Sequence, residues 1–596
     1  MPGAPHGRPG KEINVPSNAS CDGPRRRVQN TSVTKPSSHL GGHGMELAAK
    51  AQASSLRWRH PDACHVHTMS LTTPPPLATA TPLRTWLQRA LMLAFVLAMF
   101  LYGLMAIDAG IVNFRSAGDA GVAAQRQAMQ SAAENGQLPG TTTEIAEHST
   151  LLLALLSRVS SPLYTYGKQG LSEPLIHYAT MPRFNGLTLS LHNMLGGTCM
   201  LFGALQFWPA FRRRLPLWHR TFGAIYIVAA QSAMVASMVY LVRTPVADIY
   251  DQLTFYIGLW GLAIGVTLSL WMAIYSMLRK QIAQHQAWMS LNYGMLLTAP
   301  IQRYGWIAFG AATPQLRQLE ANYAVTGTLI PLSVMIGYGL FSLNRWAQAD
   351  RSAASKGKVA QAFTSQGRLG RLLAMLSLPV LGLAMWQTLL HFVIEPGIGH
   401  ATGAARFIPA GVIALDDTVV VAHALPRLLF AFGTLLGLAG GLRLLWQAFV
   451  ARQPAERFMA ASAWALPIGG FLAGATLLWW GIEMGAPSFA TQHGGALHVF
   501  GGAITLLFSS LLAWALVQGA SASAWAKEWG LFVIACLVGT PSFYWALPAM
   551  GSLGIDAIYV QTGHVYRLAA YGQWMMLIGA FVYAFYGEAT HSKLAR

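Results

Sequence analysis

The chain has 596 residues, of which 54% are hydrophobic and only 10% are charged. This balance excludes an ordinary soluble domain and is typical of proteins that cross a membrane several times. A formal net charge of +18 would suggest nucleic acid as a partner of a soluble protein, but here the basic residues follow alternate apolar segments, so membrane topology explains them and no nucleic-acid partner is predicted.

The first 83 residues are rich in Pro, Ser, Gly, Arg and Thr and show no apolar periodicity. Such a composition predicts a disordered leader over 1–83. Met69 heads a segment that looks like an ordinary translation start, so a wrongly assigned start is the alternative explanation of the leader.

Runs of about 20 apolar residues are long enough to cross a bilayer as helices. They predict an all-α, polytopic membrane protein with about twelve transmembrane helices in a six-plus-six arrangement. The predicted spans are 86–107, 187–208, 218–242, 253–277, 288–311, 322–343, 372–394, 426–448, 459–482, 493–517, 529–549 and 565–587. The segment 410–423 is a candidate re-entrant piece, because Asp416 and Asp417 argue against a full span.

These spans divide the chain into parts with different expected roles. An extracytoplasmic segment at 108–186 separates the first helix from the rest, and its amphipathic run near 144–158 predicts a partly helical cap. The predicted parts are a first transmembrane helix at 84–107, a five-helix module at 187–345, a cytoplasmic linker at 346–371, a second six-helix module at 372–587 and a cytoplasmic tail at 588–596.

Every second loop between the predicted spans is basic. Arg212, Arg279 and Arg345 follow the second, fourth and sixth spans, whereas acidic residues such as Asp251 and Glu483 lie in the alternate loops. The positive-inside rule then places both termini in the cytoplasm. We therefore expect a multi-pass protein of the bacterial inner membrane, with the lipid bilayer as its first partner.

A set of residues in the second to fifth spans carries a family resemblance. The pattern comprises His192, Gly196-Gly197, Gly203, Gln206-Phe207, Arg212, Arg214, His219-Arg220, Gly223, Tyr226, His285, Trp288-Met289 and Arg303. Over about 187–310 the chain thereby resembles a bacterial family of predicted multi-helix membrane proteins of unknown function. This chain has Gln286 and Leu291 where the family usually has basic residues, which puts an anionic ligand near His285 in doubt. The resemblance implies a similar fold and no particular chemistry.

The histidines of the predicted spans fall into two layers, one near each membrane face. Two histidines at one depth can ligate a haem iron, with glycines that admit the macrocycle and arginines that pair with its propionates. We predict haem b as the cofactor, with His192 and His498 as axial metal ligands and with a quinone or another redox protein as partner. The other candidate cofactor-binding residues are His219 and His285 as a second pair, His391, His423 and His564 in the outer layer, and Arg303, Arg427 and Arg567 as propionate partners.

Other functions remain open at this stage. Histidine also gathers at membrane interfaces simply because its ring is amphipathic. Two groups of six helices also suit a secondary transporter, and a non-enzymatic receptor or assembly protein would need no cofactor. The absence of Gly-x-x-x-x-Gly-Lys-[Ser/Thr] and Gly-x-Ser-x-Gly sequences argues against an ATPase and a serine hydrolase, which leaves a membrane oxidoreductase as the candidate enzyme class.

A weak internal repeat accompanies these patterns. The segment from Leu191 to Trp208 resembles the segment from Leu497 to Trp514, and each begins with a histidine that is soon followed by two glycines. A one-residue gap is needed to align them. Glycine pairs in apolar helices often serve only close helix packing.

Overall fold

This computed structural model describes residues 82–136, 150–352, 368–400, 403 and 405–591. The chain divides into two units, Met1–Leu77 and Ala78–Arg596, and all the described residues belong to the second. Residues 1–81 of the predicted leader and 592–596 of the predicted tail lie outside the described part. Its regular structure is helical, with one isolated bridge between Ser488 and Gln492, so the all-α prediction is confirmed.

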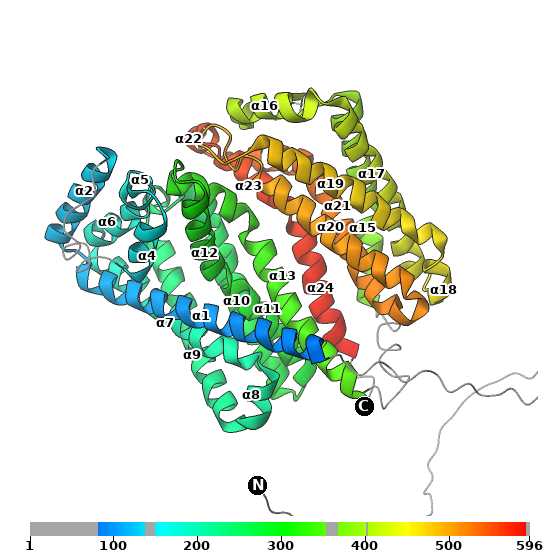
Figure 1. Cartoon of the computed structure of the whole chain (residues 1–596), viewed down its shortest axis with the longest axis horizontal. Helices are drawn as coiled ribbons and strands as arrows, with labels where there is room; N and C mark the ends of the chain where they lie inside the picture. Colours follow the sequence, from blue (N-terminus) through cyan, green and yellow to red (C-terminus); the bar gives the residue numbers. More distant parts are fainter. Residues whose placement is uncertain (1–81, 137–149, 353–367, 401–402, 404, 592–596) are drawn as a thin grey trace, which may run out of the picture. The chain divides into compact units, whose positions relative to one another are not determined.

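The first half of the described chain (82–352) holds a bundle of long helices and a group of short ones. The short helix α8 (Pro209–Arg214) separates α7 from α9. The long helices are α1 (Pro82–Ser116), α7 (Arg183–Gln206), α9 (Pro216–Arg243), α10 (Gln252–Leu278), α11 (Ile282–Leu296), α12 (Thr298–Ala312) and α13 (Gln318–Ser352). Helix α7 packs closely along α1 (Figure 1). The absence of a side chain at Gly197 permits this contact, because a Cβ atom there would lie only 2.7 Å from the Gly103 carbonyl oxygen.

Four short helices form a cap between α1 and α7. They are α2 (Ala120–Glu134), α4 (Leu151–Val159), α5 (Pro162–Tyr166) and α6 (Ser172–Thr180). The Asp119 side chain caps α2 by accepting from the amides of Gly121 and Val122, as expected of an N-cap aspartate. The Tyr164 hydroxyl donates to the Trp306 carbonyl (2.8 Å), which holds the cap against α12.

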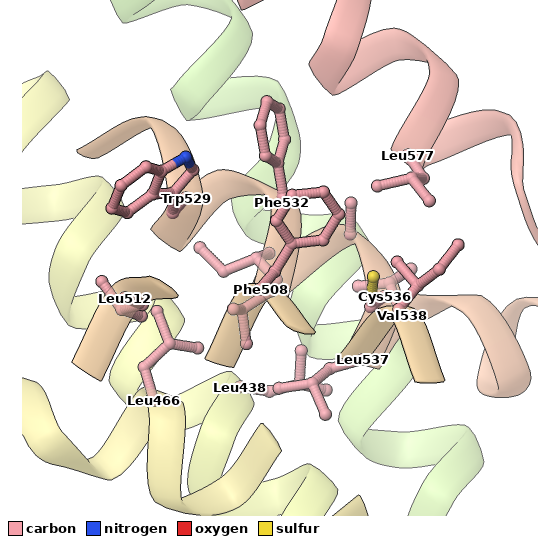
Figure 2. Packing of buried hydrophobic residues seen from close by; sticks show 14 of the residues in the cluster. Leu438, Leu466, Phe508, Leu512, Trp529, Phe532, Cys536, Leu537, Val538 and Leu577 are labelled. Carbon is pink, nitrogen blue, oxygen red and sulfur yellow. The ribbon is translucent and has the colours of Figure 1, made fainter. Parts of the chain in front are cut away.

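The second half (368–591) contains a continuous apolar core. Phe508, Phe532 and Phe581 meet there, with ring centroids 4.5–5.9 Å apart, and Leu577 and Trp529 lie around them (Figure 2). The helices of this half are α15 (Arg368–Leu389), α16 (Ala410–Asp416), α17 (Ala424–Leu444), α18 (Ala455–Phe458), α19 (Ala465–Met484), α20 (Ala496–Val517), α21 (Ser523–Gly551), α22 (Ala557–Gln561), α23 (His564–Gly572) and α24 (Met575–His591).

Ten helices of the described residues are long and apolar enough to cross a membrane. The predicted span at 187–208 is the 24-residue helix α7, which carries the polar His192 and Asn193 and is not among the ten. The predicted span at 288–311 is divided at Leu297 into α11 and α12, each only 15 residues long. The membrane-spanning fold is therefore confirmed, whereas the count of twelve and the six-plus-six arrangement stay predictions.

Candidate functional site

A cavity of about 1720 Å³ lies among helices of both halves. The first half contributes α1, α4, α6, α7 and α9 to α13, and the second half contributes α16, α21 to α24 and neighbouring loops. Ligand pockets in proteins usually measure about 300–1,000 Å³, so this cavity has room for a large ligand. Its wall includes the ionisable residues His177, His192, Asp248, Asp251, Arg303 and His564.

His192 lies in the wall on α7. Its Nδ1 atom is 2.8 Å from the Ala233 carbonyl oxygen of α9, which makes Nδ1 the protonated nitrogen of a neutral ring. The other nitrogen, Nε2, makes no hydrogen bond with the described residues. One turn along, Gly196 also lines the cavity, and a Cβ atom there would meet nothing within 4 Å. The His192 ring thus borders the open space beside Gly196.

Arg303 of α12 is a half-buried cation in the same wall. Its Nη1 atom donates to the Gln302 side-chain oxygen (2.5 Å), and its guanidinium lies 5.1 Å from the Trp306 ring. It lies within electrostatic range of His192, Tyr102 and Tyr178. No carboxylate of the described residues forms an ion pair with it, so this part of the cavity carries uncompensated positive charge.

A buried ion pair joins the two halves behind the cavity wall, and of its two residues only Asp251 lines the cavity. Arg567 of α23 donates to Asp251, which precedes α10, at 2.6 Å, and both side chains are 1% exposed. Asp251 has a left-handed backbone (φ 55°), a conformation that aspartate adopts more readily than most residues with a side chain. The Arg567 guanidinium also lies 4.1 Å from the Tyr323 ring of α13. Such a pair stabilises only while both partners are present.

Hydrogen bonds extend this ion pair into a polar network. Asn322 donates to Asp251 (3.3 Å) and accepts from Gln302 (2.8 Å) and Trp306 (3.1 Å), and Gln302 in turn accepts from Arg303. The network therefore runs without a break from the free cation of the first half to the ion pair between the halves.

His564 continues the network on the other side of Arg567. Its Nδ1 atom lies 2.9 Å from Arg567 Nη2 and 2.7 Å from Thr254 Oγ1. A guanidinium only donates hydrogen bonds, so Nδ1 accepts and the proton of the neutral ring is on Nε2. Thr254 belongs to α10, which gives a second polar contact between the halves.

Residues 189–336 match the model of a family described as a predicted membrane protein (DUF2306). The family resemblance of the sequence is thereby confirmed, and the match contains His192, Asp251 and Arg303 but not Arg567 or His564. No curated protein and no solved structure matches the chain. The matched family is itself of unknown function, so the comparison supports a multi-pass membrane protein and no reaction.

Of the ten candidate cofactor-binding residues, three line the cavity, namely His192, Arg303 and His564. Arg567 lies behind the wall, in its ion pair with Asp251. His498 of α20 does not line it and instead meets the Trp480 ring edge-on at 6.4 Å. The two residues predicted to be axial ligands, His192 and His498, thus lie in different surroundings.

The remaining candidates lie outside the cavity wall. His391 stacks on Tyr544 with ring centroids 3.8 Å apart, and His423 Nδ1 is 3.2 Å from the carbonyl oxygen of Val419, four residues earlier in the chain. Arg427 donates to the Val421 carbonyl oxygen (3.4 Å). At the opposite end of the first half, His219 and His285 lie within electrostatic range of each other, and His285 Nδ1 contacts the Ala273 carbonyl oxygen (3.0 Å).

Two features of the cavity wall have little signal in the sequence. His177 of the cap has a buried Nε2 atom with no hydrogen-bond partner among the described residues. Burial lowers the pKa of His177, and the nearby Asp248 carboxylate opposes that shift. Asn322 lies in the middle of the network, but a single asparagine at a helix end has many explanations. The family pattern around His192 and Arg303 and the outer layer of histidines, which includes His564, pointed to this region.

Proposed function

We propose that this protein is a b-type cytochrome of the membrane, an electron-transfer protein that holds haem b in the cavity. The observation that carries the proposal is that His192 and Arg303 lie in the wall of one large cavity, the first with a free ring nitrogen and the second without an acidic partner. A bound haem would supply reversible one-electron chemistry.

His192 has the hydrogen bond that is common among metal-ligating histidines. In such residues one ring nitrogen usually donates to a carbonyl or carboxylate, which fixes the ring and leaves the other nitrogen for the metal. The Ala233 carbonyl takes this role for His192. The open space at Gly196 would admit the edge of a flat macrocycle beside the ring.

Arg303 supports the same ligand through its charge. A cation inside a bilayer protein is costly unless an anion or a polar cavity compensates it, and a haem carries two propionate groups. Arg303 and the neighbouring Tyr178 hydroxyl are the groups that would hold a propionate in this wall.

His177 is the residue that best suits a second axial position. Its buried Nε2 lacks a partner, and its lowered pKa keeps the ring neutral, the form that binds metal. His564 suits the position less well, because Arg567 and Thr254 occupy its Nδ1 atom. The alternating basic loops support an orientation with the cap outside and both termini in the cytoplasm of a bacterial inner membrane.

The test is a dithionite-reduced minus oxidised visible spectrum of purified protein from haem-supplied cells, with haem counted per chain. We expect sharp α and Soret bands, and we expect His192→Ala to lose most of the haem. His498→Ala is the matched control, because His498 also begins a helix segment with two glycines but lies outside the cavity wall. A colourless protein, or haem lost from the control but kept in His192→Ala, contradicts the proposal.

A secondary transporter is the second candidate, and one observation favours it. Both interrupted helices, α11–α12 at Leu297 and α23–α24 at Gln573–Trp574, line the cavity at their interruptions. Interrupted helices at a site between two halves are common in transporters. Alternating access predicts that a cysteine at Gly196 reacts with a membrane-impermeant maleimide from both sides of sealed vesicles, whereas labelling from one side only contradicts it.

A further inference from the structure

On one side of the cavity the wall is made of exposed residues of α10 and α24. Ile257 and Gly261 of α10 and Met575 of α24 line the cavity and are also exposed on the surface, Ile257 at 45% and Met575 at 66%. Both helices belong to segments that are apolar enough to span a bilayer. With a rise of 1.5 Å per residue, Ile257 and Gly261 lie roughly 8–14 Å along α10 from its cap-side end, which is within the hydrocarbon depth of a bilayer.

Two glycines of α10, Gly258 and Gly261, lie on this side of the cavity. A Cβ atom at Gly258 or at Gly261 would meet nothing within 4 Å. Thr254, Gly258 and Gly261 are separated by four and three residues, so they share one face of α10. This face leads from the exposed surface at Gly261 to the polar network at Thr254.

The charges at the inner end of this face cancel. Asp251 and Arg567 neutralise each other in their ion pair, and Thr254 and His564 are uncharged hydrogen-bonding groups. Because His564 accepts at Nδ1, its proton is on Nε2, which also lies 3.5 Å from Arg567 Nη2. This Nε2–H is the donor that the ring has for an oxygen atom. An uncharged head group with hydrogen-bond acceptors fits this end, whereas an anion fits the separate, positively charged wall at Arg303.

We infer that a lipid-soluble quinone enters the cavity from the bilayer between α10 and α24 and accepts a hydrogen bond from His564 at a ring oxygen. A quinone has an apolar tail for this exposed side of the cavity and uncharged carbonyl oxygens for the inner end. The site goes beyond the proposed haem and does not depend on it, since the cavity volume leaves room for both.

Photolabelling tests the site directly. The full chain is placed in phosphatidylcholine nanodiscs with a short-chain azido-ubiquinone, and the labelled peptides are mapped by mass spectrometry. We expect label on the cavity-lining parts of α10 and α24, and we expect excess decylubiquinone to compete it away. Gly261→Trp and, independently, Gly258→Trp fill this side of the cavity and should lower the labelling at least tenfold.

Ile264→Trp is the matched control, because Ile264 is 48% exposed on the same helix but does not line the cavity, and its labelling should match that of the unchanged protein. Undiminished labelling in both glycine variants overturns the inference. So does a photoactivatable phosphatidylglycerol that labels the same peptides while the quinone probe does not. Haem is counted in the same samples, so that quinone labelling without haem contradicts only the proposed cytochrome, and haem without labelling contradicts only the quinone site.

Discussion

In α7, Gly196 borders the cavity and a Cβ atom there would meet nothing within 4 Å, whereas in α20 both glycines of the similar segment lie against neighbouring helices. A Cβ at Gly502 would lie 2.6 Å from the Gly474 carbonyl oxygen of α19, and one at Gly501 would lie 3.1 Å from the Trp574 ring. The glycines of the two similar segments, in α7 and in α20, therefore have different structural roles. In α20 the glycines serve helix packing alone, and in α7 one serves packing while the other opens a space.

The surroundings of the two histidines differ in the same way. His192 faces a cavity whose wall holds an unpaired cation and a polar network, whereas His498 lies beside Trp480, which belongs to the aromatic core of the second half. A histidine followed by two glycines therefore does not identify a ligand site. His192 differs from His498 in having a charged group and an open volume beside it. The charge and the open volume lie in the first half and at its contact with α23.

Replacing Arg567 and replacing Arg303 should give the largest difference in thermal stability. Arg567→Met leaves Asp251 buried without its partner, and breaking a buried ion pair costs about 3–5 kcal/mol. We expect this variant to lower the thermal midpoint of the detergent-purified protein sharply. Arg303→Met breaks no ion pair among the described residues and should change the midpoint little while it weakens binding of any anionic ligand.

Asp251→Asn controls for the loss of charge alone, and it too should be destabilising, because it leaves the Arg567 cation unpaired. An Arg567→Met protein as stable as the unchanged chain would show that the ion pair does not hold the two halves together.

The glycine pairs give the next largest contrast. Gly502→Ala places a methyl group against the α19 backbone, and overpacking of this kind costs up to about 3 kcal/mol. Gly196→Ala meets only open space, and alanine is the better helix former, so its thermal midpoint should stay the same or rise slightly. Equal destabilisation by the two variants would mean that the space beside Gly196 is filled in the folded protein.

Much of the fold could be predicted from apolar runs and charge alternation, since every predicted span corresponds to helix in the described residues. The interruption at Leu297 lies three residues before Pro300, which has no N–H to donate to the Leu296 carbonyl. The interruption at Gln573–Trp574 could not be predicted, because no proline lies near it and the helix direction there depends on packing against other helices. The prolines inside α13 and α21 lie within continuous helices, so proline alone was a poor guide to a break.

The candidate site was predictable only in part. His192 and Arg303 stood out because histidine and arginine are rare inside a membrane. The ion pair could not be foreseen, because Asp251 and Arg567 are 316 residues apart in the chain. The sequence marked Arg567 as a partner for an anion, but nothing in it pointed to the Asp251 carboxylate. Pairing across such a distance is a property of tertiary packing, which one sequence does not reveal.

The buried Asp251 and the half-buried Asp416 give the smallest of these contrasts. Asp251 has a cationic partner, whereas Asp416 of α16 accepts a hydrogen bond from the Ile398 amide (2.8 Å) and has no cationic partner among the described residues. Burial, with help from the Asp417 carboxylate and against the Ile398 hydrogen bond, raises the pKa of Asp416 to about 6. An aspartate in the unfolded chain has a pKa of about 3.9, so between these values the folded protein holds a proton that the unfolded chain has lost.

Stability should therefore fall as the pH rises from about 4 to 6 and then level off, and the loss from this group should be about 3 kcal/mol. Asp416→Asn should flatten this part of the profile when thermal midpoints are measured across the range. Asp417→Asn, at an exposed neighbouring position, should keep most of the slope. A profile that stays steep in Asp416→Asn would assign the pH dependence to another group, and one that is already flat in the unchanged protein would mean that water or a cation reaches Asp416 in the folded state.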